Sequence, residues 1–128
     1  MAQIKIYGHR ETLNPKRADL SNAIHSAVVK ALSYPEDKRF HRFIALDEGD
    51  FIHPVERSNN YLILEILMFE GRSKEAKKQL IRLLYQNLGD LGIAADDLEL
   101  VMIETPRENW GIRGLPGDEL SLNYKVGI

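Results

Sequence analysis

Cysteine is absent from the 128 residues of this chain, so disulfide bonds and thiolate chemistry are excluded. Charge of one sign is not in excess either, because 17 lysines and arginines stand against 19 aspartates and glutamates, a formal net charge of −2. Nucleic-acid binding would require a basic surface, and the composition gives no support for one. No apolar run approaches the length that crosses a bilayer, and the N-terminus has no apolar leader segment. We therefore expect a soluble cytoplasmic protein.

Signatures of metal and nucleotide sites are also missing from the sequence. The four histidines, His9, His25, His41 and His53, do not have the spacing of metal ligands. No glycine-rich loop follows a predicted strand and opens a helix, which is the context that a phosphate-binding loop requires. We therefore expect no metal site and no cofactor.

The stretch 61–91 carries the clearest structural pattern. Its first nine residues are apolar except for Glu65, as in a strand that is buried on both faces. Ser73 is a suitable N-cap, and helical spacing then relates the apolar residues Ala76, Leu80, Leu83, Leu84, Leu88 and Leu91. Arg72 therefore stands where a strand ends and a helix begins, the place where ligands gather in open α/β units. Its guanidinium is a natural clamp for a carboxylate, although a solvated arginine in a loop would show the same spacing.

The first half of the chain repeats this pattern. Residues 3–7 alternate polar and apolar, as a half-buried strand does. A polar loop is expected over 8–13, and Asn14 followed by Pro15 predicts the start of a helix. An apolar helical face follows, and residues 39–46 are predicted as the next strand. Because a full helix separates the two strands, they should be parallel.

Two β-α-β units in tandem, over about residues 2–47 and 61–104, account for most of the chain. We expect one α+β domain over residues 1–128, in which both helices cover one face of a single mixed sheet. The C-terminal tail is glycine-rich around Trp110–Gly114 and is expected to end in a short edge strand over 120–126. The strands are apolar on both sides, so the face without helices needs a cover. Assembly of several copies is the simplest one.

Four short motifs stand in a characteristic order along the chain. They are Phe51-x-x-Pro54-x-x-Arg57-Ser58, then Gly71-Arg72-Ser73 followed by Lys77-Lys78-x-Leu80, then Glu104, and finally Trp110-Gly111-x-Arg113-Gly114. Together they cover most of the sequence and resemble the tautomerase superfamily, in particular its members around malonate semialdehyde decarboxylase. The resemblance implies a homotrimer with active sites near the subunit boundaries. It also implies that an amino-terminal proline acts as base or acid on small keto, enol or unsaturated carboxylic substrates.

The sequence departs from the family pattern at the catalytic position. Ala2, not proline, becomes the first residue once the initiator methionine is removed. The acidic residue that the family has after its first helix falls near Lys38, with Asp37 one place earlier. One arginine of the decarboxylase pair corresponds to Arg72. The other corresponds to Glu70, whose negative charge would repel a carboxylate substrate.

The resemblance makes Ala2 and Asp37 the catalytic candidates. An α-amino group titrates near ~7.7–8 and burial lowers that value, so the Ala2 amine is able to act as a base or to form an imine with a carbonyl substrate. An inert terminus is the alternative, and retained methionine would favour it because one extra residue displaces the amine by about 3.8 Å. Asp37 is a candidate for activating water or a substrate hydroxyl, against a role in capping a turn.

Four residues are candidates for binding the substrate: Arg72, Arg57, Trp110 and Arg113. Arg72 is the favoured anion site, whereas for Arg57 and Arg113 a structural role in pinning loops or subunits is favoured over anion binding. Trp110 would wall the pocket or fill an interface or core. Glu65 interrupts an apolar strand, so we expect its carboxylate to be paired, within the chain or across subunits.

Two functions are compatible with these patterns. The first is a cofactor-independent isomerase or lyase of tautomerase type, acting on a small carboxylated keto, enol or unsaturated substrate. The N-terminal amine would be its base or imine-forming group, and Arg72 would bind the carboxylate. The alternative is a non-catalytic homologue that binds small acids and lost its activity with the proline.

Overall fold

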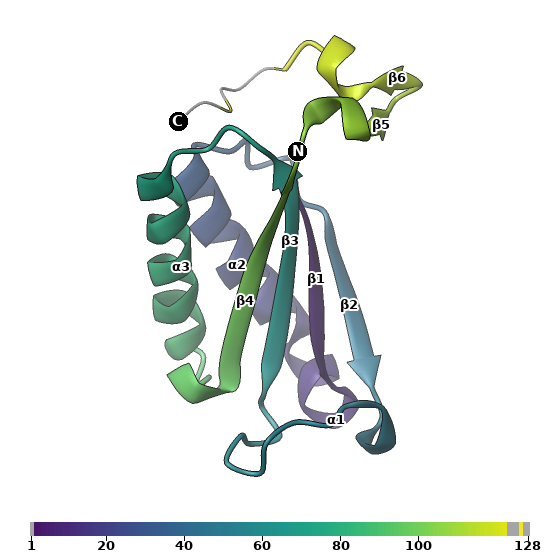
Figure 1. The fold of residues 1–128 in the computed structure, drawn as a ribbon. Coiled ribbons are helices and arrows are strands. Elements are labelled where there is room, and N and C mark those ends of the chain that lie inside the picture. The colour runs from purple at the N-terminus through teal and green to yellow at the C-terminus, as the bar shows by residue number, and fades with distance from the viewer. Residues whose placement is uncertain (1, 123–125, 127–128) are drawn as a thin grey trace.

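The computed structural model describes residues 2–122 and 126, which form a four-stranded sheet covered on one face by two long helices (Figure 1). The strands are β1 (Ala2–His9), β2 (His41–Leu46), β3 (Leu62–Phe69) and β4 (Leu98–Thr105), and the long helices are α2 (Arg17–Leu32) and α3 (Lys74–Gly89). The strand order is β2-β1-β3-β4. Both outer pairs are parallel, and the central pair of β1 and β3 is antiparallel. The predicted mixed sheet of two β-α-β units is confirmed.

Short elements complete the described part of the chain. They are α1 (Arg10–Leu13), β5 (Gly111–Ile112), β6 (Leu115–Pro116) and five 3-10 turns, η1 (Asn14–Lys16), η2 (Glu48–Asp50), η3 (Ala95–Asp97), η4 (Arg107–Asn109) and η5 (Gly117–Glu119). Within the described part of the chain, none of the helices has the length and apolar character needed to cross a membrane. Residues 120–122 lie outside any strand, so the edge strand predicted over 120–126 is wrong there, and residues 123–125 lie outside the described part.

The first helical segment begins earlier than the sequence predicted. β1 runs to His9, and α1 follows it without the polar loop that was expected over 8–13. Leu13 is buried, and Gly8 lies so close to it and to Leu62 that a Cβ on Gly8 would stand 2.9 Å from Leu62 Cδ2. Asn14 opens only a 3-10 turn and makes no side-chain cap. The prediction of a helix start at Asn14 is wrong, because the helical segment begins at Arg10. The buried side chain of Leu13 holds this segment against the sheet.

The second helix begins where the sequence predicted. The Ser73 side chain accepts a hydrogen bond from the Ala76 backbone nitrogen at 3.1 Å, which satisfies one of the free donors of the first turn of α3. Glu75 lies in that turn, where the helix dipole favours a negative charge. This cap fixes where the chain leaves β3 and enters α3, and therefore where Arg72 stands.

The two faces of the sheet differ in burial. On the helix side the core contains Ile4, Ile6, Leu64 and Ile66, all nearly inaccessible to solvent. On the other face Val101 and Ile103 of β4 are 47% and 36% exposed. There the Tyr7 hydroxyl donates to Glu65 Oε1 at 2.6 Å, so the expected partner of Glu65 lies within the chain. This contact raises the pKa of Tyr7, chiefly because the hydrogen bond holds the phenol proton.

Arg72 does not lie in an exposed turn, which is how the sequence pattern placed it. Its exposed fraction is 7%, and its guanidinium Nη1 donates to the backbone carbonyl of Leu32 at the end of α2. A cation suits this position because the carbonyls at a helix C-terminus carry partial negative charge. Arg72 therefore ties the start of α3 to the end of α2.

This burial predicts that Arg72→Ala will destabilise the protein. The substitution removes a charged hydrogen bond and leaves a cavity, so the unfolding free energy should fall by roughly 2–4 kcal/mol. Urea unfolding followed by circular dichroism measures the change. Lys78→Ala is the control, because Lys78 is an exposed residue of α3, the helix that follows Arg72, and it should change stability by no more than about 0.5 kcal/mol. Equal stability of both variants would contradict the structural role of Arg72.

His41 gives the fold a pH dependence. The pKa of His41 is lowered to about 4, chiefly by burial and in smaller part by electrostatic interaction with His25 and Arg39. Its Nδ1 lies 2.8 Å from the Ser21 hydroxyl on α2. Between about pH 6.5 and 4 the unfolded chain binds a proton at this residue that the folded chain does not bind, so stability should fall as pH falls through that window. His41→Gln should reduce this slope in unfolding experiments at several pH values, and an unchanged slope would contradict the assignment.

Candidate active site

The candidate site lies at the end of the sheet where β1 begins and β3 and β4 end. Ala2 pairs with Met68 across the central antiparallel pair, and Met68 pairs with Glu104 of β4. The small β5–β6 hairpin lies above the same end (Figure 1). The strand pairing therefore brings Ala2 beside the end of β3, which leads into the segment that carries Arg72.

The backbone nitrogen of Ala2 is buried and has a polar partner. Ala2 is 4% exposed, and its nitrogen donates to the Tyr34 hydroxyl at 3.0 Å. Tyr34 follows the end of α2 and is itself buried. The sequence analysis missed Tyr34, because no local pattern links residues 32 positions apart. Met1 lies outside the described residues, and the Ala2 nitrogen is the amide of the peptide bond with Met1, which becomes a terminal amine only when Met1 is removed.

Arg72 enters this end of the sheet from the loop between β3 and α3. Gly71, which precedes it, has a φ of +116°, a conformation that favours glycine. Glu70 is exposed, and its backbone nitrogen donates to the Thr105 carbonyl at 3.0 Å. The buried guanidinium and the exposed carboxylate therefore occupy neighbouring positions with very different access to solvent.

Trp110 packs against the end of β3. Its indole Nε1 donates to the Thr105 hydroxyl at 2.7 Å, and its ring meets the Phe69 ring edge-on with centroids 5.2 Å apart. Arg107 holds the segment that follows by donating to the carbonyls of Gly117 and Leu120. Trp110 is thus placed at the same end of the sheet as Ala2 and Arg72.

Lys77 and Glu104 add an ion pair at this end of the sheet. The Lys77 ammonium lies 2.8 Å from Glu104 Oε1, and both side chains are partly buried. Lys77 stands on the first turns of α3, whereas Glu104 stands near the end of β4. The pair joins two elements that border the candidate site.

Three of the predicted residues are not gathered at this site within the chain. Asp37 is exposed in the turn after α2, and among the described residues it makes no hydrogen bond. Arg113 is exposed and has a φ of 51°, in the two-residue turn of the β5–β6 hairpin. Arg57 lies at the opposite end of the sheet and donates to Glu99 Oε1 at 3.1 Å, near the start of β4. That hydrogen bond lowers the pKa of the Glu99 carboxyl.

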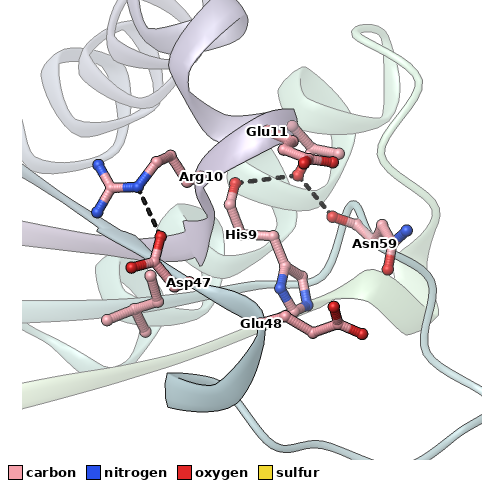
Figure 2. A pocket seen from close by; sticks show the side chains of 8 residues that line it. His9, Arg10, Glu11, Asp47, Glu48 and Asn59 are labelled. Atoms are coloured by element: carbon pink, nitrogen blue, oxygen red, sulfur yellow. Dashed lines mark hydrogen bonds and ion pairs between the residues drawn. The ribbon is translucent and has the colours of Figure 1, made fainter.

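A hollow of about 230 Å³ lies at the opposite end of the sheet, beyond the ends of β1 and β2 (Figure 2). It is lined by His9, Arg10, Glu11, Thr12, Leu46, Asp47, Glu48 and Asn59. Arg10 Nε donates to Asp47 Oδ1 at 2.8 Å, as the dashed line in Figure 2 shows. Carboxylates outnumber the guanidinium in this lining by three to one, so it does not suit a carboxylate ligand. It contains none of the residues predicted for the site.

The residues that the structure describes include no cluster of three or more histidines, aspartates or glutamates able to hold a metal ion. Proton transfer and anion binding are the chemistry that the candidate site itself offers. It combines a buried backbone nitrogen, a phenol, a guanidinium and an indole.

Comparison with known proteins places these features in a family. Residues 38–113 match the family model described as "Tautomerase enzyme". That range contains Arg57, Arg72, Trp110 and Arg113, whereas Ala2 and Asp37 precede it. A 2-hydroxymuconate tautomerase of Comamonas testosteroni is 37% identical over 57 residues, which are 44% of this chain and 90% of the relative.

Solved structures show the same fold. A malonate semialdehyde decarboxylase, with decarboxylase and hydratase activities, superposes with a TM-score of 0.79 at 23% identity over 92% of this chain and 99% of that one. A fused 4-OT that forms an asymmetric trimer superposes with a TM-score of 0.79 at 17% identity over 91% and 96%. The sequence match covers more than half of the chain, and the superpositions extend the likeness to both β-α-β units. The chain belongs to the tautomerase family.

Proposed function

We propose that this protein is a cofactor-independent isomerase or lyase that moves protons on a small carboxylated keto, enol or unsaturated substrate. The Ala2 amine, exposed by removal of Met1, is the base, and Arg72 holds the substrate carboxylate. Family membership supports the reaction class, because the relatives include tautomerase and decarboxylase activities. The observation that carries the assignment is the buried, hydrogen-bonded nitrogen of Ala2 at the end of the sheet that also holds Arg72.

The chemistry follows from these groups. In an enol-to-keto conversion the neutral amine takes the hydroxyl proton, and the resulting ammonium delivers a proton to carbon. A buried amine is suited to this exchange because loss of solvent disfavours its charged form. The guanidinium of Arg72 is also removed from water, where its attraction to a carboxylate is stronger than at the surface. A primary amine offers a second route, because it forms an imine with a carbonyl substrate.

A non-catalytic small-acid-binding protein is the alternative. It is favoured by alanine in place of the family's amino-terminal proline and by Glu70, a carboxylate two positions before Arg72. Such a protein would keep the fold and the buried guanidinium but would lack a rigid secondary amine. The two functions differ in whether the Ala2 nitrogen reacts.

Ala2→Pro tests the catalytic assignment. Intact mass first establishes whether Met1 is removed from the native chain and from the variant. Proline holds a secondary amine rigidly at the start of β1, so the variant should convert 2-hydroxymuconate at least about tenfold faster than the native chain. Conversion is followed as the loss of the dienol absorbance.

Borohydride reduction during turnover distinguishes the imine route. If the native amine forms an imine, its N-terminal peptide gains the mass of the reduced carbonyl adduct. If Ala2→Pro gains no activity and the processed native chain is not labelled, catalysis at the N-terminus is excluded and the binding function stands.

A homotrimer is the assembly we propose, with the helix-free face of the sheet at its interface. The exposed apolar residues of β4 support it, and a fused 4-OT of the same fold is described as a trimer. The native chain should therefore sediment at three times the mass of 14.6 kDa. Stacking of three such sheets would bury the exposed residues of β4 against neighbouring copies.

Ile103→Lys should dissociate this trimer, because it places a charge in an apolar interface. Ile81→Lys is the matched control, since Ile81 is 37% exposed on α3 and Ile103 is 36% exposed on β4. Analytical ultracentrifugation at micromolar concentration measures the outcome. A native chain that sediments as a monomer, or equal behaviour of the two variants, would rule out this interface.

A further inference from the structure

We infer that the C-terminal turn of α2, residues 32–34, positions both working groups of the site, and that Tyr34 is the residue that holds the N-terminal nitrogen. This inference rests on the proposed function for its catalytic meaning. Its structural content concerns the nitrogen of Ala2 and is measured without a substrate. Asp37, the acidic candidate from the family pattern, is replaced in this role by a phenol.

The geometry of the turn explains how Tyr34 reaches Ala2. Ser33 takes a left-handed conformation, with φ 49° and ψ 48°, which ends α2 and redirects the chain. The backbone nitrogens of Ser33 and Tyr34 both donate to the Val29 carbonyl, so the turn is closed on the helix. The Tyr34 side chain is thereby buried against β1, with its hydroxyl 3.0 Å from the Ala2 nitrogen.

The same turn holds the guanidinium. Leu32, two residues before Tyr34, provides the carbonyl to which Arg72 donates. One short segment therefore contacts both the proposed base and the proposed carboxylate clamp, and fixes the separation between them. A fixed separation matters because a displaced base or clamp loses the productive geometry.

Tyr34 is chemically suited to an amine that changes its charge. A phenol oxygen accepts a hydrogen bond from an ammonium, and its O–H donates to a neutral amine. The hydrogen bond from an ammonium is charge-assisted and is therefore the stronger of the two, so a phenol at the 3.0 Å position that Tyr34 holds beside the Ala2 nitrogen favours the protonated amine. Among the described residues, the charged groups at this end of the sheet include Arg72, the exposed Glu70 and the Lys77–Glu104 pair, and Arg42 of the edge strand β2 is hydrogen-bonded to Gln3.

Asp37 does not lie beside the Ala2 nitrogen. Asp37 is exposed, and the turn at 35–38 is closed by the Lys38 nitrogen donating to the Pro35 carbonyl. The side chain that is buried beside Ala2 is that of Tyr34. The family's acidic position and the residue that touches the nitrogen are therefore different residues in this chain.

Titration of the Ala2 amine tests the inference. The amine of Ala2 is first exposed, either by removal of Met1 or by cleavage of an N-terminal tag. The rate of acetylation by acetic anhydride is then measured against pH. In Tyr34→Phe the protonation equilibrium constant of the amine should fall by roughly tenfold, because the ammonium loses a charged hydrogen bond. Tyr85→Phe is the matched control, since the Tyr85 hydroxyl donates to the Leu98 carbonyl away from the site, and it should leave the titration unchanged.

A second pair of variants covers the case in which Tyr34→Phe does not fold. Ser33 is exposed, so Ser33→Gly and Ser33→Val do not alter the core, but valine is strained at a φ of 49°. Ser33→Val should shift the titration, and Ser33→Gly should not. Overlapping titration curves for the native chain and Tyr34→Phe, or for Ser33→Val and Ser33→Gly, would overturn the inference. A shifted titration in a chain without isomerase or lyase activity would instead retain the role of Tyr34 and reject the proposed function.

Discussion

The antiparallel pairing of β1 with β3 is the contact on which the rest of the structure depends. Each β-α-β unit alone would be a two-stranded parallel sheet with one helix, too small to bury its apolar strands. Joining them side by side makes a four-stranded sheet whose helix-facing residues form one core. The same pairing carries the start of one unit to the end of the other. The candidate site is a product of that pairing, because its nitrogen and its guanidinium come from different units.

Local patterns predicted those parts of the fold that depend on neighbouring residues. The strand at 61–69, the Ser73 cap and the helix after it follow from alternation, capping and helical spacing, and the structure has them. The pattern at Asn14–Pro15 was locally convincing, yet the helical segment starts at Arg10. Burial of Leu13 against the sheet decides that start, and this contact is not visible in a window of a few residues.

The site was predictable only in part, for a related reason. Arg72 could be placed at a strand-to-helix junction from the local sequence, but its hydrogen bond is to a carbonyl 40 residues earlier, which no local pattern predicts. The sequence around Tyr34 does not predict its contact with Ala2, because the two residues are 32 positions apart. Arg57 belongs to a family motif, yet the direction of β3 places it at the far end of the sheet, against Glu99. Arg72 and Arg57 are the same residue type, and the direction of β3 decides that they lie at opposite ends of the sheet.

The two units occupy one polypeptide, and this has an evolutionary consequence. In an assembly of identical short chains, every substitution appears at both ends of each paired sheet. Here the two strand-to-helix junctions differ in their contacts. Arg72 is buried against the carbonyl of Leu32, whereas Arg10 is exposed and paired with Asp47. Each end can therefore accumulate changes that the other does not share. A gene of this kind is free to keep the residues at one end of the sheet while those at the other end change.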